Sequence, residues 1–330
     1  MRNPYNNRTL SLVLAALLAV FLLTQFTQSG RPESTLRTQL VTLDTSQVSG
    51  ITLHPPGEAE AIIFRASDGG WDVQQGEVTA RADQAALDGL LSTLQGLKPQ
   101  RLAARSAEQW DTFEVTDSLG TRVEVHGNEQ TLADVYVGKF SVQATPPPPM
   151  QPGMPPVQQP QPKATSYVRL ASEPEVYAVD GFLSSSFNRP FNSWRDREFL
   201  TLDPATVTEV DFAYPADSSF TLRQQDSVWM VGSESADSAS VVNYLNQLGN
   251  LSSSDFNDTF SASGSPEFTA TLQTAEGNVR IEGYAQDSTL VMRTDRRPAV
   301  FVDSERNGLF SRVFVGRGTL VSDTTDVAPE

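Results

Sequence analysis

The strongest constraint on the fold is an internal duplication of the sequence. The stretch "RADQAALDGLLSTLQGL" at 81–97 matches "SADSASVVNYLNQLGNL" at 235–251 without a gap. In both stretches the apolar residues recur three and four positions apart, which predicts an amphipathic helix with one buried face. Asp83 and Asp237 stand just before each periodic pattern, where an N-cap carboxylate accepts free backbone N–H groups. Each copy is therefore expected to pack one helix against a sheet.

The duplication continues into segments that precede both helices. "LVTLDTSQVSGITL" at 40–53 matches "FLTLDPATVTEVDF" at 199–212, again without a gap. Between these blocks and the helices, each copy carries two short segments with the alternation of half-buried strands. The matched segments are 62–64 with 220–222 and 71–73 with 229–231. Strand, strand and helix therefore recur in one order.

Two further matches follow the helices. "GTRVEVHG" at 120–127 resembles "GNVRIEG" at 277–283, and "VYAVD" at 176–180 resembles "AVFVD" at 299–303. A repeat of this length is too long for a solenoid unit and indicates two tandem homologous domains. The predicted fold class is α+β, in which each repeat is a mostly antiparallel sheet packed by an amphipathic helix.

The junction between the repeats is expected near 194–197. The first repeat then covers 37–193, the second covers 194–320, and an acidic tail occupies 321–330. The first repeat alone carries "ATPPPPMQPGMPPVQQPQPK" at 144–163, which cannot form a packed core because proline runs favour extended conformations. We favour a tolerated insertion at a hairpin tip, since loops accept length at small entropic cost. A docking ligand or a spacer is the alternative.

The amino terminus predicts a membrane anchor. "TLSLVLAALLAVFLLTQF" at 9–26 carries no charge, and the preceding stub 1–8 contains Arg2 and Arg8. These features predict a single-pass signal anchor in the bacterial inner membrane, with the amino end in the cytoplasm and everything after the linker 27–36 outside.

A cleaved signal peptide is the competing interpretation of the same segment. The one plausible cleavage site follows "TQS" at Ser29, which lacks the alanines of the usual small-x-small pattern. The chain has no cysteine, so a lipoprotein anchor, disulfides and thiol chemistry are excluded. We favour the uncleaved anchor, which makes the lipid bilayer a partner.

The composition and the absence of known motifs argue against nucleic-acid binding and against catalytic activity. The net charge of -16 would repel a polyanion, and "WRDR" and "RTDRR" are only local basic exceptions. The two histidines, His54 and His126, have no partner carboxylate or second ligand at helical or hairpin spacing. Glycine-rich phosphate loops and a G-x-S-x-G elbow are absent. We therefore expect a non-enzymatic protein with no catalytic residue, no cofactor-binding residue and no metal site.

Recurring aspartates and tryptophans have structural explanations. The pairs Asp44 with Asp203 and Asp180 with Asp303 recur in both repeats, as turn and cap residues of a duplicated fold would. Trp71 and Trp229 occupy matching strand positions. They are expected to cover the apolar stripe of the helix rather than to stack on a ligand.

Several of these segments together resemble the DUF4340 family. They are the anchor, "GGWDV", "ADQAALDGLLSTLQGL", "YVRL...EVYAVD", "WRDREFLTLDPATVTEVDF" and "VWMV...ADSASVVNYLNQL". The sequence departs from the family pattern at "QWDTFEV" (109–115), where many members read tyrosine-glycine-leucine. The resemblance implies a membrane-anchored protein, often encoded beside ABC-type transport systems of the gliding kind, and it transfers no active-site residue.

Three functions are open at this point. The first is a membrane-anchored extracytoplasmic binding or scaffold protein, accessory to an ABC-type transporter or envelope protein. The alternative is a periplasmic ligand-binding module that holds a glycan or peptide between the repeats, because domain interfaces commonly host ligands. A hydrolase that uses His54 or His126 is the third and the least favoured.

Overall fold

The structure is a computed structural model that describes residues 37–143, 163–286 and 289–321. Within this part of the chain, no helix is long and apolar enough to cross a membrane. We refer to residues 37–193 as the first unit and to residues 194–320 as the second unit.

Several predicted segments lie outside the described residues. The predicted proline-rich loop lies there apart from Lys163, which instead begins a strand. The other segments that lie there are the stub 1–8, the predicted span 9–26, the linker 27–36 and the tail 321–330. Val321 is the one residue of the tail that the structure describes.

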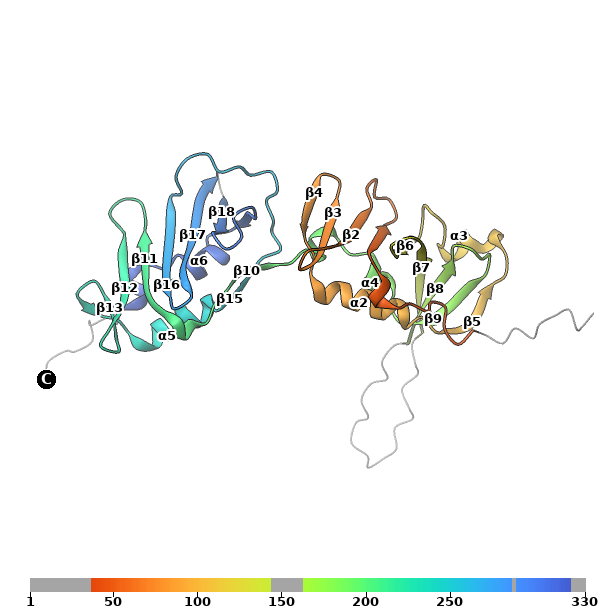
Figure 1. The fold of residues 1–330 in the computed structure, drawn as a ribbon, viewed down its shortest axis with the longest axis horizontal. Helices are drawn as coiled ribbons and strands as arrows, with labels where there is room; N and C mark the ends of the chain where they lie inside the picture. Colours follow the sequence, from red (N-terminus) through yellow and green to blue (C-terminus); the bar gives the residue numbers. More distant parts are fainter. Residues whose placement is uncertain (1–36, 144–162, 287–288, 322–330) are drawn as a thin grey trace, which may run out of the picture.

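The first unit is built on a nine-stranded antiparallel sheet with the order β4-β3-β2-β1-β6-β7-β8-β9-β5 (Figure 1). Strand β6 alternates buried and half-buried positions, so one of its sides faces the core. Strand β9 is buried at four consecutive positions, because Tyr177 and Val179 lie in the main core and Val176 and Ala178 lie in a smaller apolar cluster. The strands are β1 (Gly50–His54), β2 (Ile62–Ser67), β3 (Gly70–Gln75), β4 (Val78–Arg81), β5 (Pro99–Ala104), β6 (Thr121–His126), β7 (Thr131–Gln143), β8 (Lys163–Leu170) and β9 (Val176–Asp180).

The second unit contains an eight-stranded antiparallel sheet with the order β14-β13-β12-β11-β16-β17-β18-β19. A separate two-stranded sheet pairs β10 (Glu198–Thr201) with β15 (Asn250–Ser252). The strands of the large sheet are β11 (Val207–Ala213), β12 (Phe220–Gln225), β13 (Val228–Val231), β14 (Glu234–Ser235), β16 (Phe268–Thr274), β17 (Gly277–Gln286), β18 (Thr289–Thr294) and β19 (Val302–Ser304).

The two strand orders match from β4 to β9 and from β14 to β19, so the fold is mostly antiparallel β with two large sheets and few short helices. One predicted match is wrong. The strand order makes β6 equivalent to β16, so "GTRVEVHG" corresponds to Phe268–Thr274 and not to "GNVRIEG" in β17. The two sequences look alike because any half-buried strand alternates in the same way, which leaves the choice between neighbouring strands undetermined.

The strands that follow the long helices also differ between the units. In the first unit β5 pairs with β9 and extends the large sheet, whereas in the second unit β15 pairs with β10. The edge strand on this side of the second sheet is therefore β19.

Both predicted helices are confirmed, as α2 (Gln84–Gln95) and α5 (Ser238–Leu248). The Asp83 carboxylate accepts the Ala86 N–H at 3.0 Å, and the Asp237 carboxylate accepts the Ser240 N–H at 2.7 Å. Each helix buries one stripe in the core of its own unit, and the buried residues are Leu87, Leu90, Leu91 and Leu94 in α2 and Val241, Tyr244, Leu245 and Leu248 in α5.

The predicted cap role of Asp44 and Asp203 is also confirmed. Each begins a 3-10 turn, and its carboxylate accepts a backbone N–H two residues further on, from Ser46 and from Ala205. The remaining helical elements are short: α3 (Trp110–Phe113), α4 (Ser184–Phe187), α6 (Leu309–Val313), α7 (Arg317–Leu320), η1 (Thr45–Gln47), η2 (Ala107–Gln109), η3 (Phe191–Ser193) and η4 (Pro204–Thr206).

A polar cluster stabilises the face of the second sheet. The Glu282 carboxylate accepts hydrogen bonds from Arg293 at 2.6 Å, Tyr284 at 2.8 Å and Arg280 at 3.0 Å. Burial alone would raise the pKa of Glu282, but these three hydrogen bonds outweigh burial and hold that pKa below its ordinary value. The charged form of Glu282 is therefore favoured in the folded protein.

We expect Glu282→Gln to lower the free energy of unfolding at pH 7 by about 1–3 kcal/mol, because it weakens charge-assisted hydrogen bonds. Since the pKa is lower in the folded state, the carboxylate contributes its stability above roughly pH 4.3 and loses it as the pH falls through the folded value. The difference between variant and wild type in urea unfolding should shrink between pH 7 and pH 3. The exposed Glu276→Gln serves as control, and an equal difference at both pH values would contradict the assignment.

Candidate functional site at the junction of the two units

The segment 194–197 stands where the first unit ends and the second begins, and hydrogen bonds hold its backbone on the side of the first unit. The Asp83 N–H donates to the Trp194 carbonyl at 2.8 Å, and the Asp196 N–H donates to the Arg81 carbonyl at 2.8 Å. Trp194 is fully buried in the first core. The segment thus begins as part of the first unit.

The same segment is bound to the second unit only a few residues later. The Ser253 N–H donates to the Arg197 carbonyl at 2.9 Å, and the Arg297 guanidinium donates to the carbonyls of Asp196 and Glu198. The connection between the units is therefore short and hydrogen-bonded on both sides.

Arg195 lies at the centre of this junction, with only 4% of its side chain exposed. Its guanidinium binds the two Asp258 carboxylate oxygens at 2.6 and 2.8 Å. It lies 3.7 Å from the ring centroid of Phe256 and 5.5 Å from that of Phe191. Phe191 packs against the first core and Phe256 against the second, so one guanidinium contacts residues of both.

The Arg195 Nε is buried and has no hydrogen-bond partner among the described residues. The two terminal nitrogens of the guanidinium donate hydrogen bonds to Asp258. Burial of the Nε without a hydrogen bond costs desolvation free energy. Because Asp258 supplies the compensating charge, the buried cation depends on that carboxylate.

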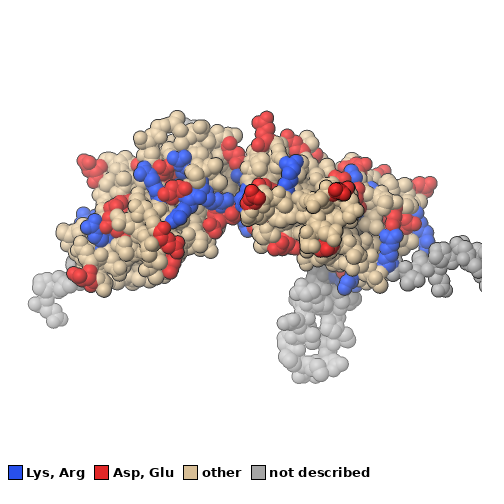
Figure 2. Space-filling model, viewed as in Figure 1, with Lys and Arg blue, Asp and Glu red and all other residues tan. Residues whose placement is uncertain are grey.

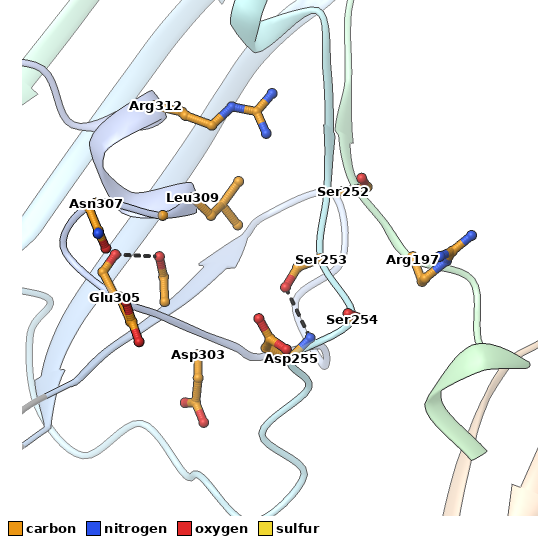
Figure 3. A pocket seen from close by; sticks show the side chains of 12 residues that line it. Arg197, Ser252, Ser253, Ser254, Asp255, Asp303, Glu305, Asn307, Leu309 and Arg312 are labelled. Carbon is orange, nitrogen blue, oxygen red and sulfur yellow. Dashed lines mark hydrogen bonds between the residues drawn. The ribbon is translucent and has the colours of Figure 1, made fainter. Parts of the chain in front are cut away.

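A cavity of about 530 Å³ opens beside the junction, on the second unit (Figure 3). Its walls come from the junction, from the segment after β15, from β19 and its following turn, and from α6. The residues that line it are Arg197, Ser252, Ser253, Ser254, Asp255, Asp303, Ser304, Glu305, Asn307, Gly308, Leu309 and Arg312.

Charged groups of both signs line different sides of this cavity. Figure 3 shows Arg312 on α6 at one side, Asp255 and Asp303 on another, and Arg197 across from α6 on the junction segment. The Asp303 carboxylate accepts a hydrogen bond from Asn257 at 2.8 Å, and Arg197 lies 3.7 Å from Asp83. Neither Arg312 nor Glu305 has a side-chain hydrogen bond or ion pair within the described part of the chain. Such a surface suits a small polar ligand that carries both charges or several hydroxyl groups.

The structure keeps the two histidines apart and away from this cavity. The registers Gly50 to His126 and His54 to Arg122 place them at opposite ends of the β1–β6 pair. No partner carboxylate was expected at helical or hairpin spacing, and the carboxylate that contacts the His54 Nε2, at 2.9 Å, belongs to Glu124, which is 70 residues away in the sequence. Glu124 comes from the neighbouring strand, a contact that no spacing along the chain reveals.

Surface ion pairs surround His54. Glu124 also lies 3.0 Å from Arg122, which in turn binds Asp134 at 2.7 Å. The hydrogen bond with Asp134 raises the pKa of Arg122, so the guanidinium stays charged. Among the described residues there is no group of three or more acidic, histidine or cysteine side chains that could hold a metal ion.

The remaining predicted residues take structural positions. Trp71 packs partly buried against the first core and Trp229 is buried in the second, as expected. Asp180 pairs with Lys163 at 3.3 Å, and Asp303 is the one recurring aspartate that also lines the cavity. Sequence reasoning singled out 194–197 as a boundary and a small basic stretch but missed its partner Asp258.

Comparison with known proteins agrees with the family resemblance. No curated protein and no solved structure matches this chain. One family model, described as "Domain of unknown function (DUF4340)", matches residues 71–143 and 158–273. These ranges contain α2, both sides of the junction and Asp258. The chain belongs to the DUF4340 family.

Proposed function

We propose that this protein is a non-enzymatic scaffold, anchored in the bacterial inner membrane by residues 9–26, whose two units hold partner proteins outside the cytoplasm. The partners would be components of an ABC-type transport system or another envelope complex. The family resemblance suggests the partner class, and the uncharged segment 9–26 after Arg2 and Arg8 supports the anchored topology.

One observation carries the proposal: the Arg195 guanidinium joins the two units through Asp258, Phe191 and Phe256. Inter-domain motion is the default for units joined by an exposed linker, whereas a buried and hydrogen-bonded junction limits it. A limited range of orientations lets surfaces on both units contact one partner assembly at the same time. Simultaneous contact raises affinity without new contacts at either surface.

Asp258→Ala should loosen the junction, because it leaves the buried Arg195 cation without its carboxylate. We expect a loss of about 3 kcal/mol of stability and a broader distribution of distances between spin labels placed on the two units. The chain has no native cysteine, so labels can be introduced at single chosen sites. Asp255→Asn is the matched control, since Asp255 lies three residues away and lines the cavity instead.

Crosslinking in membranes, followed by gentle solubilisation of the full chain, tests the scaffold function. We expect a defined partner protein to be recovered with wild type and with Asp255→Asn, and less of it with Asp258→Ala. Recovery of an isolated monomer in every case would contradict the proposal.

A ligand-binding module is the second candidate, and the 530 Å³ cavity favours it, because Arg312 at its wall has no ion pair with any residue that the structure describes. If a carboxylate-bearing glycan or short peptide binds there, it should raise the melting temperature of the full chain in detergent. Arg312→Ala should abolish that shift, because it removes the cation that faces the cavity from α6. No shift with any acidic oligosaccharide or peptide, at millimolar concentration, would remove this candidate.

A further inference from the structure

We propose that the end of the β7–β8 pair, where β7 ends and β8 begins, inserts into the bilayer surface and forms a second membrane attachment of the first unit. This inference rests on the anchored topology of the proposed function. Its occupant is the lipid bilayer itself, and the contact surface consists of Phe140, Val142 and Phe182, which we call the apolar tip.

The three apolar side chains of the apolar tip are exposed to solvent. Phe140 is 46% exposed, Val142 49% and Phe182 44%, and they are three of the six large hydrophobic side chains exposed in the described part of the chain. The rings of Phe140 and Phe182 contact each other edge to face at 5.2 Å between centroids. Phe140 and Val142 are two residues apart on β7 and therefore point to the same side. The result is a contiguous apolar projection, which a water-exposed surface would not favour.

All three lysines of the chain lie in segments that reach this end of the sheet. The chain contains only Lys98, Lys139 and Lys163, because arginine supplies all its other positive charge. Lys139 precedes Phe140, and Lys163 is directly opposite Gln143 at the end of β7. Lys98 is exposed and precedes Pro99, which pairs with Val179 on β9.

The concentration of lysine matters because the protein as a whole is acidic, with a formal net charge of -16, and Figure 2 shows Asp and Glu side chains on the surface of both units. An acidic protein is repelled by a membrane with anionic lipids, except where positive charge gathers locally. Lysines also extend their apolar stems along an inserted surface and keep their ammonium groups among the lipid phosphates. Asp180 is the acid bound to this lysine group, at 3.3 Å from Lys163.

The length of chain between the predicted span and the structure brings this surface within reach of the bilayer. The span ends at Phe26 and the described residues begin at Arg37. Fully extended, residues 27–36 reach roughly 35 Å, so Arg37 stays within that distance of the membrane.

The apolar tip lies close enough to Arg37 for this limit to apply to it. Arg37 binds Glu173, which follows the far end of β8, while Lys163 begins that strand. A strand of this length spans roughly 25 Å. The tether therefore allows the apolar tip to meet the same bilayer that holds the anchor, without unfolding of the first unit.

The test uses the full chain in vesicles of phosphatidylethanolamine and phosphatidylglycerol. Val142→Cys carries an environment-sensitive fluorophore, and lipids with brominated acyl chains act as the quencher. Val242→Cys is the matched control, because Val242 is an equally exposed valine, at 51%, on α5 of the second unit. We expect quenching at position 142 to exceed that at 242 by roughly two-fold or more, since interfacial apolar groups reach into the headgroup and acyl boundary.

A second variant separates insertion from mere proximity. Phe140→Ser combined with Phe182→Ser, in the Val142→Cys background, should reduce the quenching to the level of the control. Both rings are nearly half exposed, so these changes leave the cores intact, which circular dichroism can verify.

The outcomes distinguish the inference from the proposed function. Resistance to alkaline carbonate together with equal quenching at 142 and 242 would overturn the inference and leave the anchored scaffold standing. Extraction by carbonate would contradict the anchored function, whatever the quenching shows. Protection of the label at position 142 from a water-soluble quencher, without quenching by the brominated lipids, would mean that a second copy or another part of the chain covers the apolar tip, and would also overturn the inference.

Discussion

The arrangement of this protein depends on one buried cation. The Arg195 guanidinium lies between Phe191, which packs on the first core, and Phe256, which packs on the second, and it is neutralised by Asp258. Each sheet has its own core and its own helix, so neither needs the other to bury apolar surface. The relation between the units therefore rests on a few polar contacts around 194–197 rather than on a shared apolar interface.

Joining the units through a buried ion pair costs desolvation energy, so we infer that the junction has a role other than stability. A buried ion pair is weak evidence for stability, because desolvation consumes most of the Coulomb energy, and here the Arg195 Nε has no partner among the described residues. What such a pair supplies is geometry, since two parallel hydrogen bonds fix the guanidinium plane. A protein that presents two surfaces to one assembly benefits from fixed geometry more than from additional stability.

The distribution of charge adds a second level of organisation. Arginines form the structural ion pairs on the sheets, as in the Arg293 and Glu282 pair, whereas the three lysines gather at one end of the first unit. Arginine suits bidentate contacts with carboxylates, and lysine suits a hydrated surface charge that can approach phosphates. The polar cavity beside the junction and the apolar tip at the other end of the first unit are thus chemically different surfaces, and a scaffold can use both.

The sequence by itself determined the local elements of this protein. Helical periodicity and the preceding aspartates located α2 and α5 and their buried stripes, and the matched segments predicted β2, β3, β12 and β13, because these signals depend on residues close in the chain. Only the tertiary structure decided which strand of the first unit corresponds to which strand of the second. The segments "GTRVEVHG" and "GNVRIEG" share an alternation of apolar and polar residues that any half-buried strand shows. The pairing of Arg195 with Asp258, the cavity around Arg312 and the contact of His54 with Glu124 also came from the structure alone. Each joins residues on different elements, and a single sequence carries no record of which distant side chains the folded sheets bring within hydrogen-bond distance.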